Sequence, residues 1–335
     1  MSTPNYAGSL RSIGELLVTA GTIYLYITWR IFYCAEVFHD NEDPTANRVI
    51  FKNTTIKYKY IALPNISACN TAENQIVALV PSTPQRFAQR QAVRESWASP
   101  TLSKSIADGL VAVFFIVGAP KTAWRMSKLV KEQQSYGDLI VTDIEESYEN
   151  LVFKVNAAMR FFLTCCYRTG FMMKIDDDVI ISFDRMLEHW IEAERDKNKI
   201  YCQVWSGISP DRDPTRKWHI PYELYQEEKY PNYCDGPIYL IGRSALCEIL
   251  SSAERCYEPF PLEDVFYTGI LASEADIPRI DWRLKIYSVD ENSWDRKIVC
   301  DDHHNPITFA ISSFKSTKNL VAAFQTLSSF ECAES

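Results

Sequence analysis

Short apolar runs recur along the chain between residues 76 and 204, and polar residues bound each run. Runs of this length predict buried strands rather than helices. Their starts lie about thirty residues apart, which is the length of one strand–helix–strand unit. The runs are Ile76–Val80, Leu110–Val117, Leu139–Ile144, Phe171–Ile175 and Ile200–Val204.

Two segments between these runs show the apolar period of a helix. Alternating strands and helices predict an α/β fold with a mostly parallel central sheet and helices on both faces. In such sheets, ligands bind at the carboxyl ends of the strands, so the site is expected there. The helical stripes are Leu151, Val155, Ala158, Met159 and Phe162, and then Phe183, Leu187, Trp190 and Ile191.

The N-terminal 35 residues have the pattern of a membrane anchor. Residues 16–29 carry no charge, and the apolar stretch continues past Arg30 to residue 35, which gives about twenty residues, or one membrane span. Arg11 precedes the stretch and acidic residues follow it, which favours a cytosolic N-terminus. A cleaved signal peptide and a soluble buried helix are the alternatives. We expect a cytosolic tail at 1–15, a signal-anchor helix at 16–35, a stem at 36–74 and a luminal domain at 75–335.

Glycosylation signals and cysteines favour a luminal or extracellular body. Asn53 and Asn65 begin the sequons, both in a polar segment, 39–73, that we expect to be irregular. The ten cysteines include no C-x-x-C pair, which argues against a zinc ribbon. Cys165 and Cys166 fall in a helical pattern and are expected to be buried thiols. The disulfide candidates are Cys202, Cys234, Cys247, Cys256, Cys300 and Cys332.

Composition narrows the class of partner. The chain has 335 residues, 47% of them hydrophobic and 23% charged, as in an ordinary globular protein. Its net charge is −8, whereas binding to nucleic-acid phosphates needs an excess of Lys and Arg. We therefore expect no nucleic-acid partner.

An acidic triplet, Asp176-Asp177-Asp178, directly follows the fourth apolar run. Three carboxylates in an apolar segment repel one another and lose hydration unless a group of opposite charge compensates them. A hard divalent cation such as Mg²⁺ or Mn²⁺ would do so and could bridge to a phosphate. A solvated turn at a strand end is the alternative. A phosphatase with a nucleophilic aspartate is a weaker one, because Ile180 stands where Thr or Val is needed.

Two further groups have the residue types of a catalytic site. Glu263 and Asp264 lie between apolar residues, and a carboxylate so placed could act as general base toward a hydroxyl. Alternatively, one of them caps the helix that follows. His303 and His304 are two of only five histidines and could ligate Mn²⁺, although histidines in a polar loop are commonly surface residues.

Six motifs follow one another along the chain: RQAVRESW (90–97), FFIVG (114–118), DIEESYENLVFK (143–154), KIDDDV (174–179), YPNYCDGPIYLIG (230–242) and LEDV (262–265). They occur in the order seen in the β1,3-galactosyltransferase family, which includes β1,3-N-acetylglucosaminyl- and N-acetylgalactosaminyltransferases, and the chain resembles that family. Ser96, Glu146 and Val152 replace other residues of its patterns. Three further departures, namely Ile238, Gly242 and a Gly269 that follows the last motif one residue late, concern sugar specificity more than the reaction.

The resemblance implies a Rossmann-like nucleotide-diphospho-sugar transferase fold of the GT-A type that uses a UDP-sugar and Mn²⁺. Asp178 and Asp176 would hold the metal, with His303 or else His304 as the late ligand. The remaining donor-site residues would lie around the nucleotide, where a structural salt bridge is the alternative for both arginines. They are Arg90, Arg94, Lys174, Asp176 and Asp177.

The resemblance also implies the reaction. Asp264 would deprotonate the acceptor hydroxyl as it attacks the anomeric carbon, which inverts an α-linked donor into a β-linked product, and Glu263 would position the backbone or the acceptor. We expect transfer of galactose from UDP-galactose to the 3-hydroxyl of a glycan on a glycoprotein or glycolipid. UDP-N-acetylglucosamine or UDP-N-acetylgalactosamine is the alternative donor. A non-catalytic sugar-binding or chaperone relative is the alternative of another class. The expected location is the Golgi membrane, as a single-pass type II protein with a luminal catalytic domain.

Overall fold

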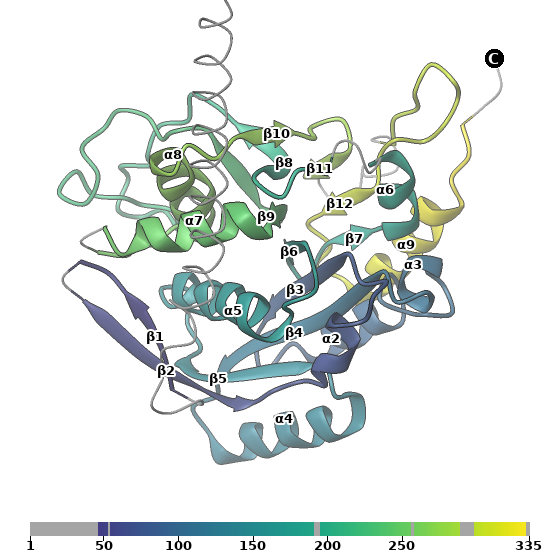
Figure 1. The fold of residues 1–335 in the computed structure, drawn as a ribbon, viewed down its shortest axis with the longest axis horizontal. Coiled ribbons are helices and arrows are strands. Elements are labelled where there is room, and N and C mark those ends of the chain that lie inside the picture. The colour runs from purple at the N-terminus through teal and green to yellow at the C-terminus, as the bar shows by residue number, and fades with distance from the viewer. Residues whose placement is uncertain (1–45, 53, 191–194, 256–257, 289–297, 333–335) are drawn as a thin grey trace, which may run out of the picture. The chain divides into compact units, whose positions relative to one another are not determined.

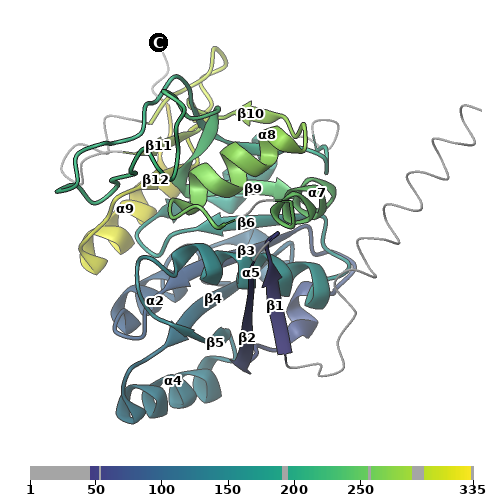
Figure 2. The same ribbon diagram turned by 90° about the vertical axis from the view of Figure 1, so that its left-hand side faces the viewer.

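The computed structural model describes residues 46–332 apart from 53, 191–194, 256–257 and 289–297. A nine-stranded sheet runs through this part of the chain (Figure 1), and Figure 2 shows its strands stacked from β10 to β5. In spatial order the strands are β1 (Ala46–Ile50), β2 (Thr55–Ala62), β5 (Leu139–Glu145), β4 (Val111–Ala119), β3 (Ile76–Ser82), β6 (Phe171–Ile175), β9 (Tyr233–Gly242), β8 (Ile200–Trp205) and β10 (Arg279–Asp281).

All five predicted strands are present, as β3, β4, β5, β6 and β8. The sheet is mixed, however, and the prediction of a mostly parallel sheet was wrong. Parallel pairing joins β5, β4, β3 and β6, and also β8 and β10. The remaining pairings are antiparallel, because β9 lies between β6 and β8 and β2 pairs with both β1 and β5. Apolar runs carry no sign of strand direction, and Gly236 and Pro237 interrupt the β9 pattern.

The segment expected to be irregular contains β1 and β2, so that expectation was wrong. In β2, Tyr58 is buried whereas Lys57 and Lys59 are exposed, which is the alternation of a strand with one covered face. The Tyr60 hydroxyl donates to the Ala157 carbonyl at 2.7 Å and ties the strand to a helix. The sheet therefore extends upstream of residue 75.

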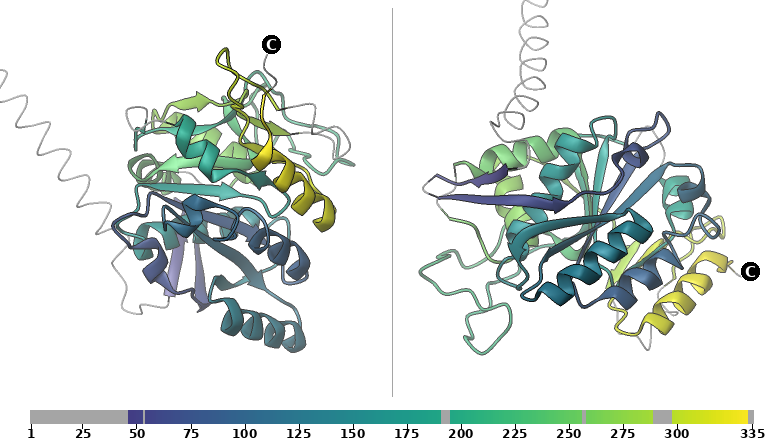
Figure 3. Two further views of the ribbon diagram at one scale, coloured as in Figure 1. Left: turned by 90° about the vertical axis from the view of Figure 1, so that its right-hand side faces the viewer. Right: turned by 90° about the horizontal axis from the view of Figure 1, so that it is seen from below.

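Helices cover both faces of the sheet (Figure 3). On one face, the Phe161 ring of α5 packs against Phe114 of β4 with 5.7 Å between the ring centroids. On the other face, Ile76 of β3 belongs to a buried cluster with Val93 of α2 and Leu320 of α9. The bounds are α2 Phe87–Arg94, α3 Lys104–Ala107, α4 Ala123–Tyr136, α5 Leu151–Cys165, α6 Phe183–His189, α7 Arg243–Ala253, α8 Ala272–Glu274 and α9 Thr317–Ser329.

The first predicted helical stripe lies on α5. Of the second, Phe183 and Leu187 lie on α6, Trp190 directly follows it, and Ile191 falls outside the described residues. Residues 66–69 form a short 3₁₀ helix, η1 (Ile66–Cys69), and residues 265–271 form a π-helix, η3 (Val265–Leu271). A smaller sheet has the order β11-β12-β7. Its strands are β11 (Ile286–Ser288), β12 (Ala310–Ser312) and β7 (Ile180–Ile181).

Three disulfides join parts of the described chain that are distant in sequence: Cys202–Cys234, Cys300–Cys332 and Cys69–Cys166. The first two confirm predicted candidates. The interpretation of Cys166 as a buried thiol was wrong, because it directly follows α5 and forms a disulfide with Cys69. Cys165 is a half-buried free thiol. Cys247 is disulfide-bonded, and Cys256 lies outside the described residues.

The predicted anchor, residues 16–35, also lies outside the described residues, as does the sequon residue Asn53. Within the part of the chain that the structure describes, no helix has both the length and the apolar character needed to cross a membrane. Asn65 is exposed, and its side chain accepts a hydrogen bond from the Ser67 amide at 3.0 Å at the start of η1.

Candidate active site

A cavity of about 540 Å³ opens at the carboxyl ends of β3, β5 and β6, where the strand pattern predicted the site. All three aspartates of the triplet line it. The turn from β3 to α2 contributes one wall, and the segment after β5 contributes another. From these elements the cavity is lined by Ser82, Thr83, Gln85, Arg86, Glu146 and Tyr148, and it is further lined by Lys154 and Lys217.

The three aspartates of the triplet are held by different partners. Asp177 accepts a hydrogen bond from the Ser82 hydroxyl at 2.7 Å and pairs with the Arg86 guanidinium at 2.7 Å. Asp176 pairs with the ammonium of Lys174 at 2.7 Å. The backbone carbonyl of Asp178 accepts from the Phe314 amide at 2.9 Å, which fixes its position beside β12.

Asp176 and Asp178 fit a divalent cation. Burial raises the pKa of Asp176 to about 7. The positive charge of Lys174 opposes this rise, and the negative charge of Asp178 adds to it. Burial and the neighbouring Asp177 also raise the pKa of Asp178. Partly buried carboxylates that repel one another are stabilised by a hard cation, and Mn²⁺ or Mg²⁺ accepts such oxygen ligands.

The histidines are not brought into this group. Among the residues that the structure describes, no three His, Cys, Asp or Glu side chains are arranged to hold a metal ion. His303 and His304 are exposed in a loop where the His303 amide donates to Asp301 at 2.9 Å.

Lys174 joins the triplet to the second acidic pair. Its buried ammonium lies 2.7 Å from Asp176 and 3.1 Å from Glu263, and the Tyr239 hydroxyl donates to the other Glu263 oxygen at 2.8 Å. Burial opposes the charged form of Lys174, but Asp176 and Glu263 outweigh it and raise its pKa. Both acidic motifs therefore share one buried cation, although they lie far apart in sequence.

Asp264 lies at the start of η3, where Oδ1 accepts a hydrogen bond from the Val265 amide at 2.8 Å. It therefore caps this helix, as the alternative to a catalytic role predicted. Oδ2 faces Gly236, and a Cβ on that glycine would lie only 2.9 Å away, so a larger residue would displace the carboxylate. Burial, followed by the charge of Glu263, raises the pKa of Asp264 to about 7. A cap with this pKa can still accept a proton near neutral pH.

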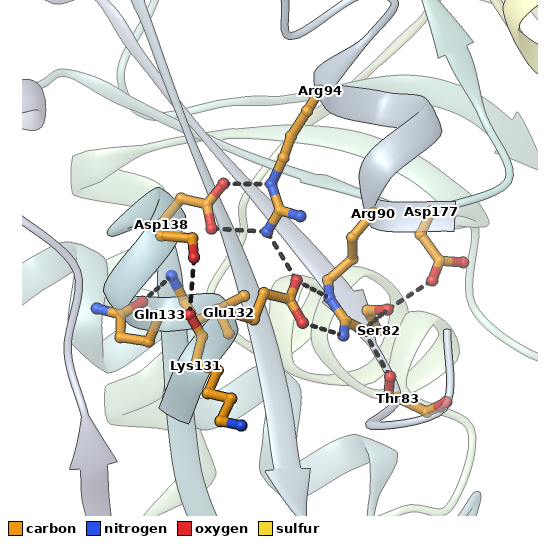
Figure 4. A network of polar contacts seen from close by, with 11 residues as sticks. Ser82, Thr83, Arg90, Arg94, Lys131, Glu132, Gln133, Asp138 and Asp177 are labelled. Atoms are coloured by element: carbon orange, nitrogen blue, oxygen red, sulfur yellow. Dashed lines mark hydrogen bonds and ion pairs between the residues drawn. The ribbon is translucent and has the colours of Figure 1, made fainter. Parts of the chain in front are cut away.

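Arg90 and Arg94 belong to a network of ion pairs and hydrogen bonds (Figure 4), and neither lines the cavity. Arg90 is fully buried and binds both oxygens of Glu132, at 2.7 and 2.6 Å. Arg94 binds Glu132 at 2.8 Å and Asp138 at 2.7 Å. Arg90 also donates to Ser82 at 3.0 Å, so it reaches the cavity only through the residue that holds Asp177. These contacts correspond to the structural alternative for both arginines.

Several cavity residues were missed by the sequence interpretation. Arg86 lies just before the arginine motif and pairs with Asp177. Lys154 ends a recognised motif, and its ammonium bridges Glu146 at 2.6 Å and the Ser82 carbonyl at 2.9 Å. Lys217 comes from the long connection between β8 and β9. Only Lys154 carried a local sequence signal, because the other two reach the cavity through tertiary structure.

The sequence model of the family described as Galactosyltransferase matches residues 88–283, which is more than half of the chain. The chain belongs to the galactosyltransferase family. This finding confirms the predicted family and enzyme class, a glycosyltransferase. The matched region contains the triplet, Lys174, Glu263 and Asp264.

Relatives of this galactosyltransferase-family chain include proteins named for different donor sugars. It is 27% identical over 262 residues to a β1,3-galactosyltransferase (bre-2) of Caenorhabditis elegans, covering 76% of this chain and 72% of that protein. It is 25% identical to a mouse lactosylceramide 1,3-N-acetyl-β-D-glucosaminyltransferase, covering 69% and 63%. It is 29% identical to mouse β1,3-galactosyltransferase 1, covering 58% and 59%. The chain thus spans less than two thirds of each of the two mouse proteins.

Solved structures similar to this chain include a glycosyltransferase involved in the glycosylation of the major capsid of PBCV-1, with 9% identity, a TM-score of 0.39 and coverage of 75% of this chain and 99% of that one. Another is the galactosyltransferase LgtC in complex with donor and acceptor sugar analogues. Its identity is 8% and its TM-score 0.38, with coverage of 75% and 95%.

Proposed function

We propose that this protein is an inverting, metal-dependent glycosyltransferase that moves galactose from UDP-galactose to the 3-hydroxyl of an acceptor glycan in β linkage. One observation carries the proposal. A cavity at the strand ends, lined by the acidic triplet, is joined through the buried Lys174 to an acidic pair that includes a carboxyl group with a pKa of about 7.

Asp264 is the proposed general base. A base works best when its pKa lies close to the operating pH, because it must be ionised and must still bind the proton firmly. Burial and Glu263 give Asp264 this property. Oδ1 is held by the Val265 amide, so the carboxylate has a fixed direction for receiving the acceptor proton. Glu263, held by Lys174 and Tyr239, positions the start of η3.

The donor diphosphate is proposed to lie against the triplet. Asp176 and Asp178 would hold Mn²⁺, which when bound supplies Lewis-acid stabilisation of the charge on the departing UDP. Arg86 and Lys217 place two further positive groups at the cavity lining. Arginine matches phosphate geometry through paired N–H groups, whereas lysine acts as a point charge.

We further propose a type II orientation in the Golgi membrane through residues 16–35, with glycans attached at Asn53 and Asn65 and an acceptor glycan carried by a glycoprotein or glycolipid. The exposure of Asn65 agrees with glycosylation there. UDP-N-acetylglucosamine and UDP-N-acetylgalactosamine are the alternative donors, and the likeness to the mouse N-acetylglucosaminyltransferase supports the first.

UDP release by the full chain, purified in detergent from eukaryotic cells, tests this proposal. The three UDP-sugars would each be offered with a panel of acceptor glycans, in Mn²⁺ and in EDTA. We expect release that requires Mn²⁺, one donor and one acceptor class. Release that persists in EDTA would contradict metal dependence. Absence of both turnover and Mn²⁺-dependent UDP binding would favour the non-catalytic alternative.

A further inference from the structure

The connection between β8 and β9, residues 206–232, brings an exposed aromatic residue to the mouth of the cavity. Lys217 lines the cavity, and its ammonium lies 4.4 Å from the ring centroid of Tyr148 and 5.6 Å from that of Trp218. Tyr148 itself also lines the cavity. The two rings therefore flank one lysine at the boundary between the cavity and solvent.

The base of this connection is well ordered. Asp211 and His219 form a β-bridge, and the Arg212 guanidinium donates to the carbonyls of Ile220 and Tyr225, each at 2.8 Å. Ile220 is fully buried. Trp218 lies within this bridged segment, directly before His219, and is 56% exposed as a residue. A fixed, exposed aromatic side chain is suited to binding because little conformational entropy is lost when a ligand covers it.

Tyr148 links Trp218 to the proposed base. Burial raises the pKa of Tyr148, the Asp264 carboxylate adds to this rise, and a hydrogen bond from the side chain of Trp218 opposes it. Trp218 does not itself line the cavity, but its neighbour Lys217 and its partner Tyr148 both do.

We propose that Trp218, supported by Tyr148, is the platform on which a pyranose ring of the acceptor glycan stacks. The proposal rests on the transferase function proposed above. The C–H groups on one face of a sugar carry partial positive charge and are attracted to the electron-rich face of an indole. Stacking orients the ring while its hydroxyl groups remain free, so one of them can face Asp264.

The test compares Trp218→Ala with the wild type in the full chain. Loss of the ring should raise the KM for the acceptor about tenfold, while the KM for the UDP-sugar and the kcat at saturating acceptor stay unchanged. Trp218→Phe should restore most of the loss. Trp124→Ala is the matched control, because Trp124 is 63% exposed and has Lys128 over its ring at 3.9 Å, yet lies on α4 and does not line the cavity.

Binding provides a second readout that does not depend on turnover. Saturation-transfer NMR with the methyl β-glycosides of galactose, N-acetylglucosamine and N-acetylgalactosamine should show contact of at least one glycoside with the wild type and with Trp124→Ala, and a clearly weaker signal with Trp218→Ala. A rise in the UDP-sugar KM would overturn the acceptor assignment and place Trp218 on the donor. Equal glycoside binding by all variants, or none by the wild type, would also overturn it. Glycoside binding through Trp218 without any sugar transfer would contradict only the transferase function.

Discussion

At the scale of single residues, Asp264 caps η3 and is also the general base of the proposed reaction. Oδ1 caps η3, and the group as a whole has its pKa raised from 3.8 to about 7. Asp264→Asn keeps the shape and an oxygen for the cap but cannot accept a proton. We expect turnover to fall by about a hundredfold or more, while UDP binding measured by calorimetry is retained. Near-normal turnover would leave Asp264 with only its capping role.

The same substitution makes a pH prediction. A carboxyl group whose pKa in the folded state is about 7 loses its base form as the pH falls below 7. Wild-type kcat/KM should therefore fall about tenfold per pH unit below that point, and the residual activity of Asp264→Asn should lack this limb. Folding stability depends on pH in the opposite direction to activity.

The folded state binds the Asp264 proton more tightly than the unfolded chain does. The stabilisation from this proton is therefore fully present below pH 3.8 and is lost as the pH rises through about 7.

At the level of elements, α2 and α4 meet through the buried pair of Arg90 and Glu132. Arg90→Ala leaves Glu132 buried with only Arg94 as its partner. Breaking a buried ion pair from one side costs about 3–5 kcal/mol, and we expect a loss of this order in urea unfolding. Lys104→Ala, which breaks the exposed pair with Asp108, should leave the free energy of unfolding unchanged. A similarly small effect for Arg90→Ala would contradict a stabilising role.

The elements also show what could be predicted from sequence. The strands from β3 to β6 are buried on both faces, so their apolar runs stand out. By contrast, β2 alternates buried and exposed residues, and Gly236 and Pro237 interrupt β9. The triplet was recognisable because it directly follows a buried strand.

Other parts of the site carried weaker signals. Arg90 matched a family motif, yet its buried pairing with Glu132, which lies 42 residues away, could not be read locally. Lys217 reaches the cavity from the connection between β8 and β9, where hydrogen bonds such as that from Arg212 to the Ile220 carbonyl fix the backbone. The sequence thus indicated which site residues follow strands, whereas the side chains that contact those residues are known only from the tertiary structure.

At the scale of the whole molecule, the disulfide between Cys69 and Cys166 closes the longest of the three described loops, with a sequence separation of 97. It ties η1, which follows β2, to the end of α5. In the loop-entropy account, a cross-link across about 100 residues restricts the unfolded chain strongly, and loss of a native disulfide typically costs 2–5 kcal/mol. We expect the double variant Cys69→Ser/Cys166→Ser to lose stability of about this size in urea unfolding.

Cys165 provides the matched control, because it neighbours Cys166 in sequence but is a free thiol. Cys165→Ser should keep the stability of the wild type, whereas Cys166→Ser alone should behave like the double variant and leave Cys69 open to alkylation. If Cys165→Ser instead lost stability and Cys166 became alkylated, the pairing would involve the other cysteine. The cross-link persists only where thiols are oxidised. A reductant should therefore lower the free energy of unfolding of the wild type by more than that of the double variant, which has already lost this disulfide. That difference would also support folding of the chain in an oxidising compartment, which a luminal catalytic domain requires.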